Sequence, residues 1–174
     1  MTEQQKEELL EEIMIEHGDD LVRLAYQYVK DHETAKDMVQ NTFIKCYQNL
    51  ETFRYDASIK TWLYRITINQ CKDYLKSWNY RKTSVREFME TAITTVLPST
   101  EKQILKQAEK QEMRNHIFSL APKYRELIFL YYYKSLTLEE IAEITEVNLN
   151  TVKTRLRRAK DQLKDVIEEA NIYG

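Results

Sequence analysis

Apolar residues recur every three or four positions along most of the chain, which is the spacing of one face of an α-helix. In the N-terminal half this pattern predicts two short helices separated at Gly18, followed by two longer ones: Leu9–Glu16, Leu21–Val29, His32–Leu50 and Thr61–Trp78. In the C-terminal half it predicts helices near Glu101–Leu120, Pro122–Lys134, Thr137–Thr145 and Leu149–Ala170. The 174 residues include only two glycines and two prolines, which leaves few sites for the tight turns that strands need. We therefore predict an all-α fold.

The helical pattern is interrupted once over a long stretch. Residues 83–100 are rich in Thr and Ser, lack periodicity and contain Pro98, which is typical of a linker. We therefore predict two small helical domains, residues 1–86 and 101–174, joined by a flexible linker at 87–100. Ser58 is a plausible cap for the fourth helix, Thr137 with Glu140 forms a capping-box pattern, and Pro122 suits a first helical turn.

Charge is distributed unevenly along the chain. The formal net charge is −2, but residues 151–164 contain six cations and one anion and residues 54–86 carry +6, whereas residues 1–20 carry −7. Two basic segments in two predicted domains suggest two contacts with one polyanion.

Residues 138–163 combine an acidic helix, a short turn and a helix rich in cations. Ala142 lies ten residues before Val152, where the two helices of a helix-turn-helix approach each other closely. Short polar side chains such as Asn148 and Thr151 stand at the start of the second helix, where recognition helices contact DNA. A solvated cationic face is the alternative interpretation, and the acidic helix and turn that precede it make that alternative weaker.

The first basic segment interleaves cations with aromatic residues between Arg54 and Arg81. Cations pair with phosphates and aromatic faces stack on unpaired bases, so this composition suits single-stranded nucleic acid. Trp62 lies at helical spacing with core residues, and core packing is the alternative for it. Asn69 could read a base edge through its amide, and a buried, hydrogen-bonded asparagine is the alternative there.

Other kinds of site find no support in the sequence. There is no glycine-rich phosphate loop, Cys46 and Cys71 form no C-x-x-C pair, and the three histidines are scattered. No nucleophile–base pair can be identified, so we expect neither enzymatic activity nor a cofactor or metal. The acidic N-terminus is unlike a secretory signal and no apolar run reaches membrane-spanning length, so we expect a cytoplasmic protein.

Motifs in both halves resemble the extracytoplasmic-function sigma factors of bacterial RNA polymerase, which belong to the sigma-seventy superfamily. Residues 21–53 contain a sequence similar to that family's A-x-D-x-V-Q-x-T-F helix, and residues 58–75 one similar to K-T-W-L-Y-R-I-x-x-N-x-x-x-D-x-L. Residues 120–144 and 150–163 resemble its L-P…R…EIA…TVKxRLxRAxxxL pattern. The resemblance covers both predicted domains in the same order.

The resemblance implies a promoter-recognition subunit with three sets of contact residues. Contacts with the clamp of core RNA polymerase would involve Asp37, Gln40, Asn41 and Phe43. Contacts with the −10 promoter element, including capture of a flipped base by the loop 54–59, would involve Arg54, Tyr55, Lys60, Asn69, Lys72 and Asp73. Contacts with the −35 element in the major groove would involve Thr151, Lys153, Thr154, Arg157, Arg158 and Lys160. The other partner that the resemblance implies is a membrane-anchored anti-sigma protein, and the genes controlled would be stress-related.

The chain departs from the family pattern in the turn between the last two helices. Glu146 and Asn150 stand where the family usually has glycine, and a non-glycine residue in a left-handed turn costs about 1 kcal/mol. Asn148 replaces a frequent proline and is compatible with capping the following helix.

Two other classes of protein share some of these features. A repressor or activator that binds duplex DNA alone would have the same helix-turn-helix, but it would not need the aromatic and cationic helix 61–81. A helical adaptor or anti-sigma protein would have no use for a charge of +5 on one helix.

Overall fold

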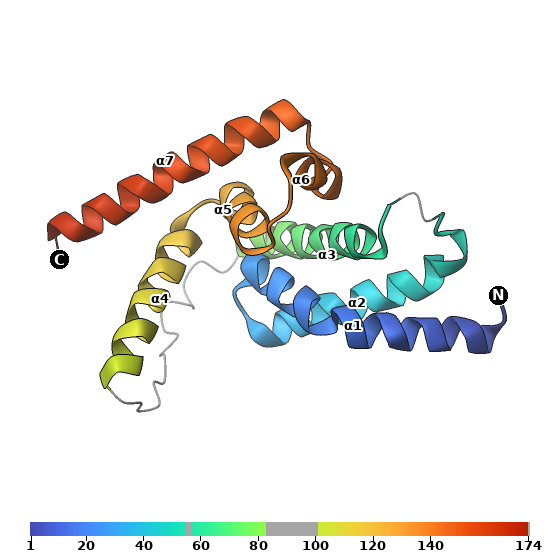
Figure 1. Cartoon of the computed structure of the whole chain (residues 1–174). Coiled ribbons are helices and arrows are strands. Elements are labelled where there is room, and N and C mark those ends of the chain that lie inside the picture. The colour runs from blue at the N-terminus through green and yellow to red at the C-terminus, as the bar shows by residue number, and fades with distance from the viewer. Residues whose placement is uncertain (55–56, 83–100, 174) are drawn as a thin grey trace.

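The computed structural model describes the backbone at residues 1–54, 57–82 and 101–173, and the side chains at 1–54, 57–77 and 108–172. Its elements are α1 (Glu3–Val29), α2 (His32–Asn49), the short 3-10 helix η1 (Leu50–Thr52), α3 (Ile59–Lys82), α4 (Glu101–Ser119), α5 (Pro122–Ile128), the π-helical segment η2 (Phe129–Tyr133), α6 (Leu138–Thr145) and α7 (Leu149–Tyr173). These residues contain helices and no strand (Figure 1), so the prediction of an all-α fold is confirmed.

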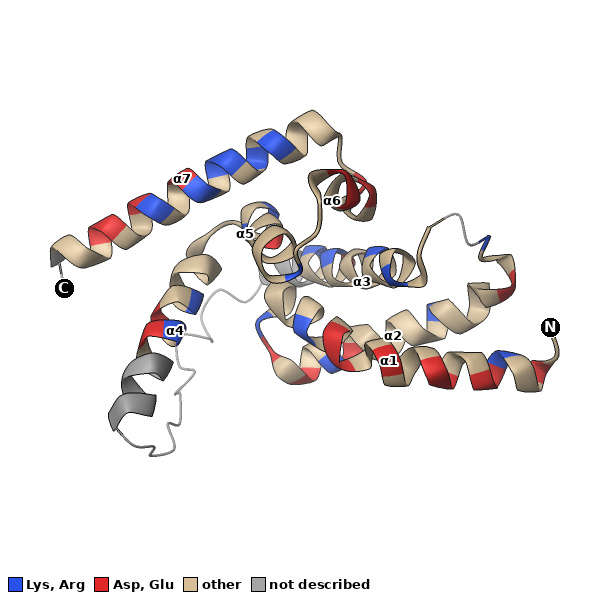
Figure 2. Ribbon diagram, viewed as in Figure 1, with Lys and Arg blue, Asp and Glu red and all other residues tan. Residues whose placement is uncertain are grey.

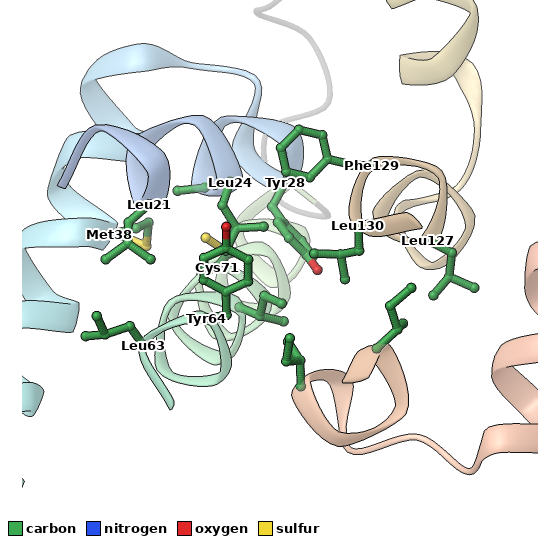
Figure 3. Packing of buried hydrophobic residues seen from close by; sticks show 14 of the residues in the cluster. Leu21, Leu24, Tyr28, Met38, Leu63, Tyr64, Cys71, Leu127, Phe129 and Leu130 are labelled. Atoms are coloured by element: carbon green, nitrogen blue, oxygen red, sulfur yellow. The ribbon is translucent and has the colours of Figure 1, made fainter. Parts of the chain in front are cut away.

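Helices α1, α2 and α3 pack together and form what we call the N-terminal unit (Figure 1). Helix α1 ends at Val29, and the capping residue Lys30 adopts a left-handed conformation with φ 59°. Asp31 then caps α2, because its carboxylate accepts a hydrogen bond of 2.8 Å from the Thr34 amide. This short turn reverses the chain and lets Leu21 of α1 and Met38 of α2 share one core (Figure 3).

Helix α1 continues through Gly18, so the prediction of two separate helices is wrong. A glycine inside a helix costs roughly 1 kcal/mol relative to alanine, which is less than the gain from the apolar face that continues on both sides of it. Ile13, Leu21, Leu24 and Tyr28 are all buried at helical spacing. Packing of this face against α2 and α3 therefore outweighs the local preference of glycine.

Helix α3 begins with the predicted cap. The Ser58 hydroxyl accepts a hydrogen bond of 3.1 Å from the Thr61 amide, and the helix runs to Lys82. It buries Leu63 and Ile68 against α1 and α2. The opposite face of the helix is thereby left for other contacts.

Helices α4 to α7, together with η2, form the C-terminal unit. Pro122 is the first residue of α5, as predicted, but the α-helix ends at Ile128 and a π-helical turn follows. In this turn the Lys134 amide donates to the Phe129 carbonyl, five residues back, at 3.1 Å. The predicted single helix Pro122–Lys134 is therefore a shorter α-helix with a widened last turn.

The predicted helix-turn-helix is formed by α6 and α7. The capping box is present, since Thr137 accepts from the Glu140 amide at 3.1 Å and the Glu140 carboxylate accepts from the Thr137 amide at 2.7 Å. Glu146 ends α6 in a left-handed conformation, with φ 56°, as a glycine would. Asn150 lies inside α7 with no positive φ, so the strain expected there is absent. Asn148 accepts from the Asn150 amide at 2.8 Å at the start of α7, which agrees with its predicted capping role.

The two units are in contact. Their buried residues form one connected cluster, in which Tyr28 of α1 lies near Phe129 and Leu130 of η2 (Figure 3). Helix α3 also packs against α6. The predicted linker, residues 87–100, lies outside the described residues.

Candidate nucleic-acid interface

Helix α7 presents a cationic face to solvent. Val152, Leu156 and Ala159 are buried at helical spacing and hold the helix against the C-terminal unit. The predicted −35 contacts are arranged around the rest of the helix: Thr151, Lys153, Arg157, Arg158 and Lys160 are exposed and Thr154 is half-buried. Thr154 donates to the Asn150 carbonyl at 3.0 Å, so its hydroxyl is partly committed to the helix.

The charge on α7 has a direction. Lysines and arginines occupy the part nearer α6 and acidic residues the part nearer the C-terminus (Figure 2). Within the described part of the chain, Lys153, Arg157, Arg158 and Lys160 form no ion pair, whereas Lys164 lies 3.7 Å from Glu168. Unpaired cations on an exposed helix beside a helix-turn-helix turn are suited to phosphate and base-edge contacts.

Helix α3 carries the second predicted site, and its residues differ in how available they are. Arg54, Lys60, Asn69 and Asp73 are exposed, and the Lys60 ammonium lies 5.5 Å from the centre of the Tyr64 ring. Asn69 is therefore on the surface, which removes the alternative that it is a buried structural amide. Tyr55 lies outside the described residues.

The aromatic residues near the start of α3 pack on one another. The rings of Phe53 and Trp62 stack with centroids 4.6 Å apart and an interplanar angle of 24°. Both side chains are half-buried. Trp62 also packs against the buried core, which supports the core-packing alternative for at least part of its side chain.

Lys72, predicted to contact the −10 element, is engaged by the C-terminal unit. Its ammonium lies 3.3 Å from the carboxylate of Glu126 on α5, and Glu126 is 2% exposed. The hydroxyl of Tyr28 donates to the same carboxylate. Burial, followed by the charge and hydrogen bond of Glu126, raises the pKa of Tyr28 well above its usual value, which keeps this hydroxyl a donor.

Arg65 forms a second link between α3 and the C-terminal unit. Its guanidinium donates to the Glu143 carbonyl at 3.2 Å and lies 3.6 Å from the Glu143 carboxylate and 3.9 Å from that of Glu146. Figure 2 shows the acidic helix α6 over the basic helix α3. These carboxylates are about half exposed, so the pairs are individually weak.

Arg125 is a buried cation that joins α5 to the end of α1. It is 4% exposed, and its guanidinium donates to the carbonyls of Gln27 at 2.6 Å and Tyr28 at 3.0 Å. Carbonyls in the last turn of a helix lack partners within the helix and attract cations. Desolvation lowers the pKa of Arg125, although the nearby Tyr28 and Glu126 oppose this.

Asp20 links α1 to α3 and to the C-terminal unit. Its carboxylate accepts from the Lys134 ammonium and the Tyr64 hydroxyl. Burial alone would raise the pKa of Asp20, but the hydrogen bonds from Lys134 and Tyr64 outweigh burial and hold that pKa below its usual value. Asp20 is therefore ionised and paired at neutral pH.

Helix α2 has the polar face expected of the predicted polymerase contact, with one correction. Asp37, Gln40 and Asn41 are exposed, but Phe43 is 8% exposed and belongs to the core. Phe43 follows the buried spacing of Val39 and Cys46, so it cannot belong to the exposed face of the same helix.

Ile44 is a residue of this face that the sequence analysis missed. It is 51% exposed, four residues after Gln40 and three after Asn41, which places all three on one side of the helix. The helical register of Ile44 relative to Gln40 and Asn41 is the signal in the sequence that could have identified it. An apolar side chain amid polar ones on an exposed face is common in protein contacts.

The C-terminal unit also has an apolar groove that the sequence analysis missed. It has a volume of about 370 Å³ and is lined by Ile128, Tyr132, Lys160, Leu163, Lys164, Ile167 and Glu168. Tyr131, Tyr132 and Tyr133 of η2 are all exposed. The π-helical turn, which the sequence did not reveal, determines which side chains of this aromatic run face outward.

Cys46 and Cys71 are buried free thiols, and burial raises their pKa values to about 11 and about 12. No group of three metal-binding side chains occurs in the described part of the chain. Among the same residues, no helix is long and apolar enough to cross a membrane.

Two family models match the chain in order. The model for sigma-70 region 2 matches residues 7–80, and the model for sigma-70 region 4 matches residues 111–163. The first match contains the α2 and α3 faces, and the second contains α5, α6 and the cationic part of α7.

Curated proteins that resemble the chain along most of its length are RNA polymerase sigma factors. The factor SigV of Bacillus subtilis (strain 168) is 36% identical over 151 residues, covering 87% of this chain and 86% of the relative. The factor YlaC of the same organism is 31% identical over 155 residues, covering 84% and 89%. The ECF RNA polymerase sigma-E factor of Escherichia coli (strain K12) is 29% identical over 163 residues, covering 90% and 85%.

Solved structures share the fold. The sigma factor RpoE from Bartonella quintana, in complex with the anti-sigma factor NepR, superposes with a TM-score of 0.68 at 22% identity, covering 91% of this chain and 96% of that one. CnrH, in complex with the cytosolic domain of CnrY, superposes with a TM-score of 0.65 at 20% identity, covering 94% and 90%. Because both family models match in order and sigma factors are similar over almost the whole length, this chain belongs to the sigma-70 family of RNA polymerase sigma factors, within its extracytoplasmic-function group, and acts in transcription initiation.

Proposed function

We propose that the chain recognises promoters through two separate surfaces while bound to core RNA polymerase. Helix α7 reads the −35 element with Thr151, Lys153, Thr154, Arg157, Arg158 and Lys160. Helix α3 and the loop before it engage the −10 element with Arg54, Tyr55, Lys60, Asn69, Lys72 and Asp73. The observation that carries the proposal is the exposed cationic face of α7, whose cations have no acidic partners among the described residues.

The polymerase contact is assigned to α2. Asp37, Gln40 and Asn41 share an exposed face with Ile44, and Phe43 is left out because it is buried. The predicted division into residues 1–86, 87–100 and 101–174 would place the polymerase and −10 contacts in the first domain and the −35 contacts in the last. Such a factor acts beside polymerase and chromosome in the cytoplasm and supplies binding energy without catalysing a reaction itself.

Promoter-specific run-off transcription tests the proposal. Core polymerase reconstituted with the purified chain should initiate from its promoter, whereas core polymerase alone should not. A protein that binds duplex DNA but gives no transcript and does not co-purify with core polymerase would be a plain repressor, and the proposal would fail.

Strand opening is the part of the proposal that separates it most clearly from a duplex-binding regulator. Stacking is worth about 1–3 kcal/mol per base, enough for several contacts to offset local unpairing. Permanganate footprinting should show reactive thymines near −10 with the wild-type holoenzyme. Asn69→Ala should change the preference at one −10 position without abolishing opening.

A protein inhibitor would regulate such a factor from outside. Two solved structures with the same fold are complexes, one with an anti-sigma factor and one with the cytosolic domain of CnrY. We propose that a membrane-anchored anti-sigma protein restrains this chain, and that the genes it controls respond to stress. Co-expression of a neighbouring membrane-protein gene should lower reporter activity, and full activity with every such candidate would contradict the proposal.

A further inference from the structure

The interface between the two units brings carboxylates of one unit onto cations of the other. On α3, Lys72 contacts Glu126, and Arg65 contacts Glu143 and Glu146. These two cations lie on the side of α3 turned away from its buried core, as Asn69 and Asp73 do. A carboxylate oxygen and a phosphate oxygen make the same charged hydrogen bonds to lysine and arginine.

We propose that the C-terminal unit acts as an internal competitor for the −10 DNA surface of α3, with Glu126, Glu143 and Glu146 occupying the positions of DNA phosphates until the units separate. The inference rests on the proposed function, because it takes α3 to be a DNA-binding helix. The surface that covers α3 in this proposal belongs to the same chain.

Glu126 is the central member of this competitor. It is 2% exposed, and a carboxyl group buried to this degree needs hydrogen-bond partners within the protein. Tyr28 and Lys72, both from the N-terminal unit, supply its hydrogen bonds. When the units separate, Glu126 returns to water and Lys72 becomes available to DNA in the same step.

Arg125, next to Glu126, ties the same helix to the end of α1. Two of its four hydrogen bonds to carbonyls, those to Gln27 and Tyr28, cross between the units. The other two, to Phe118 and Leu120, remain within the C-terminal unit. The guanidinium therefore keeps partners when the units separate, so opening exposes it without leaving it unpaired.

Glu146 supports the inference from an independent direction. It adopts the left-handed conformation that favours glycine, so the local backbone gains nothing from a glutamate here. What the side chain adds is its contact with Arg65 of the other unit. Glu146 is therefore unfavourable for the turn by itself, and it contributes a favourable contact only while the two units are packed together.

The test compares the full-length wild-type chain with Glu126→Gln and with the triple variant Glu126→Gln, Glu143→Gln, Glu146→Gln. Binding to a fluorescent 20-nucleotide oligo-dT is measured by anisotropy at low salt, and the radius of gyration by X-ray scattering. The control is Glu7→Gln, Glu8→Gln, Glu11→Gln, which changes the net charge by the same amount on the exposed face of α1.

We expect the triple variant to bind the oligonucleotide about tenfold more tightly than the control variant and to have a larger radius of gyration. Lys72→Ala in the triple background should remove most of the gain. An affinity equal to that of the control, together with an unchanged radius, would overturn the inference. If Glu126→Gln fails to fold, Glu143→Gln with Glu146→Gln tests the same idea at exposed positions.

Run-off transcription separates this inference from the proposed function. On our proposal Glu126→Gln should transcribe as well as wild type once bound to core polymerase, because the restraint concerns the free chain. Intact transcription with no gain in oligonucleotide binding would overturn the restraint alone. Absence of promoter-specific transcription by the wild-type holoenzyme would instead overturn the proposed function.

Discussion

Neighbouring residues on α2 have opposite roles because of their position on the helix. Phe43 is buried, whereas Asp37 and Gln40 are exposed. Phe43→Ala should lower the free energy of unfolding by about 3–5 kcal/mol, since it leaves a cavity. Asp37→Ala with Gln40→Ala should change it by less than about 0.5 kcal/mol each and weaken core-polymerase binding. Urea denaturation and a pull-down titration measure the two effects, and an unchanged affinity would remove α2 from the polymerase contact.

Asp20 predicts how stability responds to acid. Its pKa is held below the usual value in the folded chain, so its pairing with Lys134 and Tyr64 stabilises the fold above the unfolded pKa of about 3.9. This stabilisation is lost as pH falls through the folded pKa. The melting temperature of wild type should therefore fall more steeply below about pH 4 than that of Asp20→Asn. Asp19→Asn, at the exposed neighbour, should follow wild type, and parallel curves for all three proteins would show that Asp20 contributes nothing.

At the scale of single helices, α1 offers a stabilising substitution. Gly18 is in the middle of the helix, and a Cβ built there meets no atom within 4 Å. Gly18→Ala should raise the free energy of unfolding by about 0.5–1 kcal/mol, because alanine restricts the unfolded chain and fits the helix. Thermal denaturation would show the shift. A lower melting temperature would mean that α1 bends or opens at this point.

Helix α7 predicts a graded effect on DNA binding along its length. Lys153→Ala and Arg158→Ala should each weaken binding to the −35 element by about 1–3 kcal/mol for a base contact, or reduce the salt slope by about one unit for a phosphate contact. Lys164→Ala is the matched control, because Lys164 pairs with Glu168 nearer the acidic end. Titrations at several salt concentrations measure both quantities, and equal losses in all three variants would contradict a localised recognition surface.

Most helices could be predicted from local signals. Two predictions, a break at Gly18 and a single helix Pro122–Lys134, were wrong for physical reasons. Ser58, Thr137 with Glu140, and Pro122 marked helix starts because caps act within one turn. The break predicted at Gly18 is absent because tertiary packing outweighs the low helix propensity of glycine, which costs about 1 kcal/mol. The π-helical turn at η2 could not be foreseen, because the uninterrupted apolar and aromatic run at residues 127–133 has no periodicity that would distinguish a π-helical turn from an α-helical one. Of the two turn positions where the family usually has glycine, Glu146 is left-handed and Asn150 is not.

At the scale of the whole molecule, the sequence predicted the candidate surfaces but not what covers them. The exposed positions of α7 and α2 follow from helical register, which is local. The contacts of Lys72 with Glu126 and of Arg65 with Glu146 join residues more than 50 positions apart. Nothing in the periodicity of either helix indicates such a pair, because many arrangements of the two units would satisfy the same apolar faces.

The widened turn at η2 makes the joint between the units sensitive to chain length. A π-helical turn contains one residue more than an α-helical turn needs, and each residue in an α-helix turns the chain by about 100°. Deletion of a single tyrosine from Tyr131–Tyr133 would let α5 continue as an ordinary helix and would carry Lys134 away from Asp20. Insertions and deletions here are thus a route by which related chains could acquire different resting arrangements while retaining the same recognition helix.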